Sequence, residues 1–305
     1  MKTVNLTHPY FATLCLLFSA SLWGIIWYPV RLLEEAGLSA VWSSLNMYLA
    51  AGVLVLPVLW RQYDVIFKNR GDLLILAVAA GITNVTFLIA LTEGDVMRVM
   101  LLFYLSPLWT VLLGRWWLKE HLSLSAGIML LIAMSGTLVM LWNNDIGFPW
   151  PHDRADWLAL IASFSFSINN VQARKLNFVS IKVKTAVIWW GVVITSLCIL
   201  YLQQTPFPDV SITAWLGAWA LGWLGIVVMT VTVLYGVASM PVYKSSVIML
   251  FELVVAAIAA WWLTKEVMSV QEWCGGGLIL LAAYGVAKTE SNAKVSLNKI
   301  GVEDD

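Results

Sequence analysis

The chain has 305 residues, of which 60% are hydrophobic and only 12% are charged. A water-soluble domain carries charge on about a quarter of its residues, so this composition excludes an ordinary soluble protein and indicates a surface that mostly faces lipid. Eighteen Lys and Arg balance eighteen Asp and Glu, which leaves no net positive field to attract nucleic acid. Cys15, Cys198 and Cys274 lie in or beside apolar runs without forming a close pair, which predicts neither a disulfide framework nor a zinc site.

Ten apolar stretches are each long enough to cross a membrane as a helix, which takes roughly 20 residues for a hydrocarbon core of about 30 Å. In chain order they are 10–30, 39–60, 73–92, 96–118, 122–142, 155–173, 183–202, 212–236, 242–263 and 270–287. They are too long and too uniformly apolar for the alternating strands of a membrane barrel, so helices are expected. The first stretch follows a single Lys2 without a small-residue cleavage site, and we expect a retained span rather than a signal peptide.

The longest connection is 143–156, which reads NNDIGFPWPHDRAD and has the glycine, prolines and acidic residues of a loop. It separates a first unit of five spans, residues 1–142, from a second unit of five spans, residues 157–288. Residues 289–305 form a tail, and its polar part from Ser291 onward is expected to be disordered.

Basic residues in short loops predict the orientation in the membrane. With the N-terminus placed in the cytoplasm, only Arg31, Arg98, Arg154 and Lys265 lie on the outer side, and the other 14 of the 18 Lys and Arg lie inside. This split predicts a multi-pass protein of a bacterial-type inner (plasma) membrane, with both termini cytoplasmic and the 143–156 loop external.

Many of the 18 tryptophans stand near predicted span ends, as in the aromatic belts of membrane proteins. Five others lie deeper, and for these a packing role is expected rather than contact with a ligand. They are Trp23, Trp109, Trp189, Trp190 and Trp223.

The two units resemble each other. Leu113–Glu120 reads LGRWWLKE at the end of the fourth span, and Ala259–Glu266 reads AAWWLTKE at the end of the ninth. Glu120 and Glu266 are 146 positions apart, as are Arg98 and Lys244. Because five is odd, the second copy enters the membrane from the opposite side. The predicted fold is therefore an all-α polytopic membrane protein, with ten transmembrane helices as two inverted five-helix repeats, the architecture of many secondary transporters.

These endings resemble those of the drug/metabolite transporter superfamily, in its ten-span EamA type, over about residues 10–288. The fourth span has the expected apolar stretch with a proline, Leu105-Ser-Pro107, and the terminal Glu120. The ninth span has Glu252, but Leu253 replaces the proline that usually follows, and Asn46 stands where an arginine is frequent. The resemblance implies a transporter, in a family whose substrates include amino acids, other metabolites and drugs.

Glu252 is the most informative single residue. It lies ten residues into the ninth span, about 15 Å deep at 1.5 Å per residue and thus near the middle of the membrane. A carboxylate there costs several kcal/mol unless it is paired, hydrated or protonated. Two functional interpretations remain, namely proton coupling or pairing with an amine on the substrate. The structural alternative is a hydrogen bond that locks helices together.

Other polar residues in the spans are candidates for lining a shared cavity. Ser163, Ser167 and Asn170 share one face of the sixth span, where they either line a cavity or join helices by hydrogen bonds. Asn46 and Asn84 are single polar residues in apolar surroundings.

The fourth span adds Tyr104 and Trp109 as weaker candidates. Pro107 lies between them, and it removes a backbone hydrogen bond and can kink the helix beside the site.

We therefore interpret the chain as a secondary transporter, not an enzyme, that exports small organic metabolites, with amino acids as the leading class. The first alternative is a multidrug exporter that uses Glu252 as proton carrier. The second is a membrane enzyme or lipid-carrier translocase, which needs polar residues gathered at one interface. The densest such group, Glu93, Asp95 and Arg98, sits on a tight outer turn where solvation explains it.

A channel would need a ring of charge or a carbonyl filter, and neither pattern is present. No cofactor or metal is expected, because the sequence has neither a Walker-type GxxxxGK[ST] motif nor histidines at ligand spacing. The expected partners are a small-molecule substrate, the lipid bilayer and, as a candidate coupling ion, the proton. Monomer and homodimer both remain open.

Overall fold

The computed structural model describes residues 9–94, 96–142, 150–264 and 269–299, and every regular element within them is a helix. The all-α class is therefore confirmed. In chain order the elements are α1 (Pro9–Glu35), α2 (Ala40–Leu54), α3 (Leu56–Arg61), α4 (Tyr63–Lys68), α5 (Arg70–Glu93), α6 (Val96–Phe103), α7 (Ser106–Trp117), α8 (Leu124–Leu141), α9 (Arg154–Lys175), α10 (Ile181–Leu202), α11 (Ile212–Leu221), the π-helix η1 (Gly222–Ile226), α12 (Val227–Ser239), α13 (Val242–Met249), α14 (Phe251–Thr264) and α15 (Val270–Lys299).

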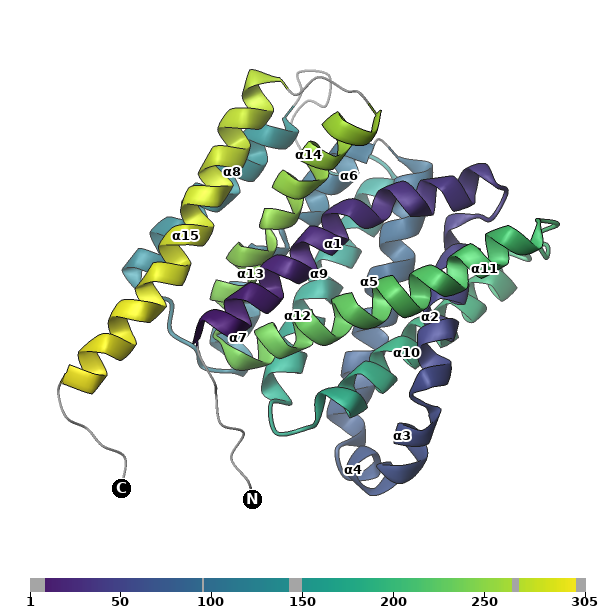
Figure 1. The fold of residues 1–305 in the computed structure, drawn as a ribbon, viewed down its shortest axis with the longest axis horizontal. Helices are drawn as coiled ribbons and strands as arrows, with labels where there is room; N and C mark the ends of the chain where they lie inside the picture. Colours follow the sequence, from purple (N-terminus) through teal and green to yellow (C-terminus); the bar gives the residue numbers. More distant parts are fainter. Residues whose placement is uncertain (1–8, 95, 143–149, 265–268, 300–305) are drawn as a thin grey trace.

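Each predicted span coincides with one helix or with a short series of helices (Figure 1). Seven segments are long and apolar enough to cross a membrane: Tyr10–Glu35, Arg70–Leu91, Arg98–Trp117, Leu124–Leu141, Ile181–Leu202, Ile212–Ser239 and Val242–Leu263. The second, sixth and tenth predicted spans do not meet that standard. The helix α2 has only 15 residues, α9 carries many Ser, Asn and Gln side chains, and α15 has Gln271 and Glu272 in its first turn. Crossing by these three helices stays a prediction.

Side-chain caps define where several helices begin. The side chains of Ser123, Asp153 and Ser180 accept hydrogen bonds from backbone N–H groups in the first turns of α8, α9 and α10. Such caps satisfy donors that have no partner within the helix.

The helix α15 continues to Lys299. The tail at residues 289–305 and its disorder from Ser291 stay predictions. Residues 288–299 contain neither glycine nor proline, so nothing in the sequence interrupts the helix.

Helix packing has the same pattern in the two halves of the chain. If the spans of the first half correspond in order to those of the second, the α5–α9 contact corresponds to the α1–α12 contact. In the same way the α7–α9 contact corresponds to the α1–α14 contact. The structure has both contacts of each corresponding pair. The chain passes from α6 to α7 in one direction and from α13 to α14 in the opposite direction (Figure 1). These observations support an inverted arrangement of the two repeats.

The pair α8 and α15 packs closely at one edge of the bundle (Figure 1). A Cβ atom on Gly136 would lie 2.7 Å from the Gly275 carbonyl oxygen, and one on Gly275 would lie 2.6 Å from the Gly136 carbonyl oxygen. Only glycine at both positions allows this backbone approach, which is a common device for packing helices in membranes. Within the run Gly275–Gly277, Gly275 makes this close approach, whereas a Cβ atom on Gly277 would meet nothing within 4 Å.

The outer surface is rich in large apolar side chains, as expected where a bundle meets lipid. Exposed tryptophans at or near helix ends include Trp60, Trp116, Trp157, Trp262 and Trp273. Their positions fit the predicted interfacial belt.

Candidate functional site

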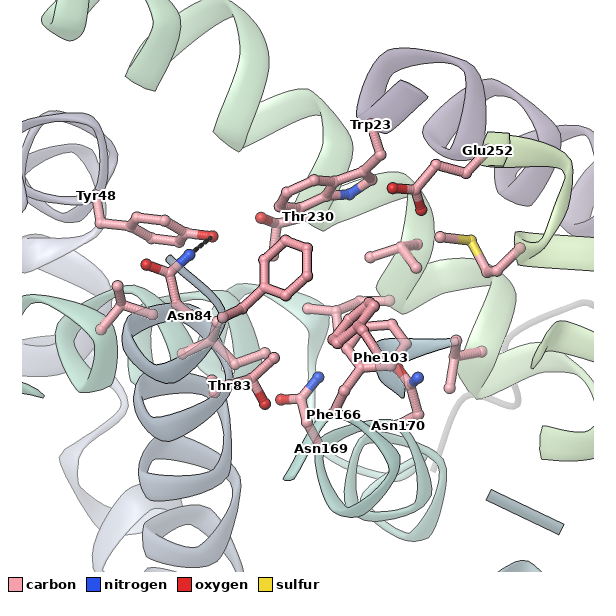
Figure 2. Close-up of a pocket in the computed structure, with 18 residues that line it drawn as sticks. Trp23, Tyr48, Thr83, Asn84, Phe103, Phe166, Asn169, Asn170, Thr230 and Glu252 are labelled. Atoms are coloured by element: carbon pink, nitrogen blue, oxygen red, sulfur yellow. Dashed lines mark hydrogen bonds between the residues drawn. The ribbon is translucent and has the colours of Figure 1, made fainter. Parts of the chain in front are cut away.

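A central cavity lies between helices of the two halves. It contains about 920 Å³ of space between atoms, a figure that includes open solvent. Figure 2 shows its polar and aromatic side chains converging from α1, α2, α5 and α6 of the first half and α9, α12 and α14 of the second. The lining residues are Trp23, Tyr48, Ala80, Thr83, Asn84, Phe87, Phe103, Phe166, Asn169, Asn170, Ile188, Val192, Thr230, Val233, Leu234, Val237, Met249 and Glu252.

The helices of the fourth and ninth predicted spans are both interrupted beside this cavity. The first break lies at Tyr104–Leu105 and the second at Leu250. Tyr104 and Leu250 are 146 positions apart, which is the offset of the sequence repeat, so the two breaks occupy equivalent positions. At each break the backbone makes short-range bonds, from Leu105 N to the Leu102 carbonyl and from Leu250 N to the Val247 carbonyl, at 3.3 and 3.2 Å. The first break is explained by Pro107, but the second has no proline. Discontinuous helices at matching positions of two repeats are typical of substrate sites in transporters.

Glu252 lies in the first turn of α14, just past the second break, and lines the cavity. The Tyr104 hydroxyl donates a hydrogen bond to its carboxyl group. Tyr104 comes from the first half of the chain and is only 5% exposed. The two broken helices are thus joined through the single carboxyl group of the cavity.

The neighbouring helix α1 approaches the backbone of α14 at Gly24. A Cβ atom there would lie 2.7 Å from the Glu252 carbonyl oxygen and 3.0 Å from the Ala256 nitrogen. Because Gly24 has none, α1 packs directly on α14. The preceding Trp23 then directs its indole into the same part of the cavity as the Glu252 carboxyl (Figure 2).

A polar network holds the wall formed by α2 and α5. Asn84 accepts a hydrogen bond from the Ser44 hydroxyl at 2.5 Å and donates one to the Tyr48 oxygen at 3.4 Å. Thr83 donates its hydroxyl proton to the Ala79 carbonyl at 2.7 Å. The Oδ1 atom and one N–H of the Asn84 amide, and the hydroxyl proton of Thr83, are therefore engaged within the protein.

The helix α9 provides Asn169 and Asn170. The Asn169 Oδ1 atom is buried and has no hydrogen-bond partner among the residues that the structure describes. Buried polar atoms are normally paired, so an acceptor without a partner in a cavity wall suits a ligand that brings an N–H or O–H group.

Four of the eight residues singled out from the sequence belong to the cavity or contact it. Glu252, Asn84 and Asn170 line it, and Tyr104 touches it through Glu252.

The other four residues lie outside the lining, and among the described residues the buried Trp109 Nε1 and Ser163 Oγ atoms have no hydrogen-bond partner. Asn46 donates to the Trp42 carbonyl at 2.8 Å, and Trp109 packs edge-on against Phe164 with ring centroids 5.7 Å apart. Ser167 donates to the carbonyls of Ser106 and Ser163 at 2.8 and 3.0 Å, and Ser163 is fully buried.

Sequence reasoning missed most of the aromatic wall, including Trp23, Phe87, Phe103 and Phe166. Apolar aromatic residues are common throughout membrane helices, so their presence alone is not a signal. Two local patterns were available: Trp23 precedes a glycine in α1, and Asn169 is adjacent to Asn170.

Ion pairs join the two halves at both ends of the bundle. At one end Arg98 of α6 binds Asp156 of α9 at 2.7 Å, with side chains only 11% and 2% exposed. The expectation that solvation accounts for Arg98 is therefore wrong, because the start of α9 covers it and supplies a carboxylate. Glu93 of the same turn pairs with Arg154 at the surface, and Asp95 lies outside the described residues.

At the opposite end Glu120 accepts from Arg174 at 3.3 Å and from the Val242 backbone N–H at 2.9 Å. This carboxylate thus caps the start of α13. Its predicted counterpart Glu266 lies outside the described residues.

Comparisons with known proteins agree with this architecture. The model of the EamA-like transporter family matches residues 10–142 and again residues 153–288, which supports the repeat predicted from the sequence. A solved crystal structure whose description names no activity aligns with a TM-score of 0.71 and 17% identity, over 90% of this chain and 96% of that chain. At that identity the likeness shows the fold alone. No curated protein matches the chain.

Proposed function

The chain belongs to the EamA-like transporter family of membrane transporters, and we propose that it carries a small organic molecule across the membrane by alternating access, with the central cavity as the substrate site. The observation that carries this proposal is the placement of Glu252. It lies in a cavity built by both halves of the chain, beside two helix breaks at matching positions of the repeats. Such a cavity can open to either side when the halves tilt against each other.

The two sets of ion pairs support the alternating-access part of the proposal. The positions of Asp156 and Arg174 on α9 are 18 residues apart, about 27 Å along a helix at 1.5 Å per residue. The Arg98–Asp156 pair and the Glu120–Arg174 pair therefore connect the halves at opposite ends. Opening one end requires one pair to separate while the other stays closed.

Glu252 is the proposed coupling group. A carboxyl group near the middle of a membrane is costly and marks a functional position by default. It can exchange a proton or hold a cationic substrate, and in either role it ties substrate binding to the positions of the broken helices. Exchange of a proton at Glu252 makes the proton the proposed coupling ion.

We place the transporter in the inner membrane with both termini in the cytoplasm, since 14 of the 18 Lys and Arg lie on that side. We propose export as the direction, on the resemblance to the family. Amino acids are the leading proposed substrate class. The aromatic wall of Trp23, Phe87, Phe103 and Phe166 favours the second candidate, a proton-coupled exporter of amphipathic drugs.

A membrane enzyme or lipid-carrier translocase is less well supported. Its polar residues would have to gather at one interface, and the densest charged group there is engaged in ion pairs. Glu93 binds Arg154 at 3.0 Å and Arg98 binds Asp156 at 2.7 Å.

Counterflow in proteoliposomes tests the proposal. Vesicles containing the purified protein are loaded with an unlabelled amino acid or cationic drug and diluted into a trace of the same labelled compound. A carrier gives a transient accumulation of label above equilibrium for at least one compound of the panel. Accumulation no greater than in protein-free vesicles, for every compound, would contradict carrier function, and equilibration without overshoot would indicate a channel.

A further inference from the structure

We infer that the substrate is a protonated amine with an aromatic or bulky apolar body, and that the cavity disfavours the free carboxylate of a zwitterionic amino acid. This inference rests on the proposed function, because it names the substrate class of the same cavity. It follows from three properties of the lining.

The first property is charge. Among the 18 lining residues that the structure describes, Glu252 is the single carboxyl group, and there is no Lys, Arg or His. A cation in this cavity gains an opposite charge. A carboxylate gains none, and burying an unpaired charge is costly. A zwitterion would match its ammonium group and leave its carboxylate without a cation.

The second property is the presence of hydrogen-bond acceptors in the lining, beside the N–H donors of Asn169, Asn170 and Trp23. Thr83 has committed its only proton to the Ala79 carbonyl, so towards a ligand its oxygen can only accept. The Asn169 Oδ1 atom is a buried acceptor without a partner among the described residues. Glu252 is the acceptor for the ammonium group. Thr83 and Asn169 lie on the side of the cavity away from Glu252 (Figure 2), where they can accept from another N–H or O–H group of the ligand.

The third property is the aromatic wall. Phe103 lies at the centre of a cluster, with ring centroids 4.4 Å from Phe87 and 5.5 Å from Phe166. These rings provide an apolar surface for the body of the ligand. The Trp23 indole points into the part of the cavity that holds Glu252 (Figure 2), and indole is the aromatic face that attracts a cation most strongly.

The test uses the full-length purified protein and compounds that share one phenyl group. Phenethylamine and phenylalaninamide are cations, phenylalanine is a zwitterion, 3-phenylpropanoate is an anion and 2-phenylethanol is neutral. Their Kd values are measured by isothermal titration calorimetry, and their counterflow is measured in proteoliposomes. We expect both cations to bind more tightly than phenylalanine, by on the order of tenfold, and the anion to bind most weakly.

Variants locate the preference. Glu252→Gln should weaken both amines by about tenfold or more while leaving 2-phenylethanol unchanged, so retained binding of the alcohol shows a folded cavity. Trp23→Phe should bind the amines better than Trp23→Leu, because Phe keeps a π face. Glu35→Gln, which alters an exposed carboxylate at the end of α1, is the matched control and should bind as the parent does.

Phenylalanine bound as tightly as phenylalaninamide would overturn the inference, and so would amine binding that is unaffected in Glu252→Gln. Binding of none of these compounds would overturn it as well. Amine binding that depends on Glu252 but gives no counterflow would uphold the ligand class and refute transport. Counterflow of phenylalanine without a preference for amines would uphold transport and refute the ligand class.

Discussion

The Arg98–Asp156 pair offers the sharpest test of how the two halves are held together. In Asp156→Asn the side chain keeps its size and much of its hydrogen bonding but loses the charge that compensates Arg98. In the parent protein Arg98 Nε reaches both carboxylate oxygens, at 2.9 and 2.7 Å, and the His152 backbone N–H donates to the same carboxylate at 2.9 Å. The substitution therefore removes the negative charge that Asp156 supplies to the buried guanidinium.

The expected loss in the free energy of unfolding is about 3–5 kcal/mol, the usual cost of removing the charge of one member of a buried ion pair. This is a large share of the roughly 5–15 kcal/mol that stabilises a typical domain. Arg98→Met with Asp156→Leu replaces both charges with apolar groups. The double variant should lose about 2 kcal/mol less than the sum of the two single variants.

Unfolding in mixed micelles, titrated with denaturing detergent and followed by circular dichroism, measures these free energies. Glu93→Gln is the control, because its pair with Arg154 is exposed at 68% and 36% and should contribute no more than about 1 kcal/mol. If Asp156→Asn were as stable as Glu93→Gln, or if the two single losses were additive, the pair would not hold the halves together.

Three further predictions concern packing, the site and topology. Gly275→Ala should destabilise the protein by about 1–3 kcal/mol, since its Cβ would lie 2.6 Å from the Gly136 carbonyl oxygen. In the same titration the control Gly277→Ala, whose Cβ has nothing within 4 Å, should be neutral or stabilising. Equal losses in the two variants would refute the close α8–α15 approach. Gly24→Ala should push α1 away from the Glu252 backbone and lower counterflow by about tenfold. The control Gly71→Ala, whose Cβ lies in open space, should transport normally. Unchanged flux in Gly24→Ala would show that this contact does not position the site. Cysteine at position 144 should react with a membrane-impermeant thiol reagent in intact cells and cysteine at position 298 should not, and the reverse pattern would overturn the proposed orientation.

The repeat and the break in the fourth span were predictable, because both follow from local sequence patterns. The Lys119-Glu120 and Lys265-Glu266 endings fix the 146-residue offset, and Pro107 removes a backbone donor. The break at Leu250 has no proline beside it. It can be predicted only by adding the 146-residue offset of the repeat to the position of the first break. The depth of Glu252 could be counted along its span, which is why it was found.

The errors have a common physical cause. Arg98 and Asp156 are 58 positions apart, so no local pattern shows that α9 buries the arginine and supplies its partner. In the same way Asn46 and Ser167 fit a cavity-lining pattern by type and spacing. Their hydrogen bonds instead go to nearby carbonyls, a choice that depends on how each helix is rotated about its axis. Rotation also decides that Trp23 and Asn169 face the cavity.

The central claim is that the cavity around Glu252 is the transport site and that its carboxyl group couples transport to protons. The most direct measurement is substrate flux in proteoliposomes, with and without an imposed pH gradient, for the parent protein and Glu252→Gln at matched amounts. Gln keeps the size and hydrogen-bonding ability of the side chain but cannot titrate. We predict that the parent responds to the gradient and that the variant is slower and loses this response. Equal rates and an equal response in both proteins would contradict the account and leave Glu252 as a residue that only joins helices.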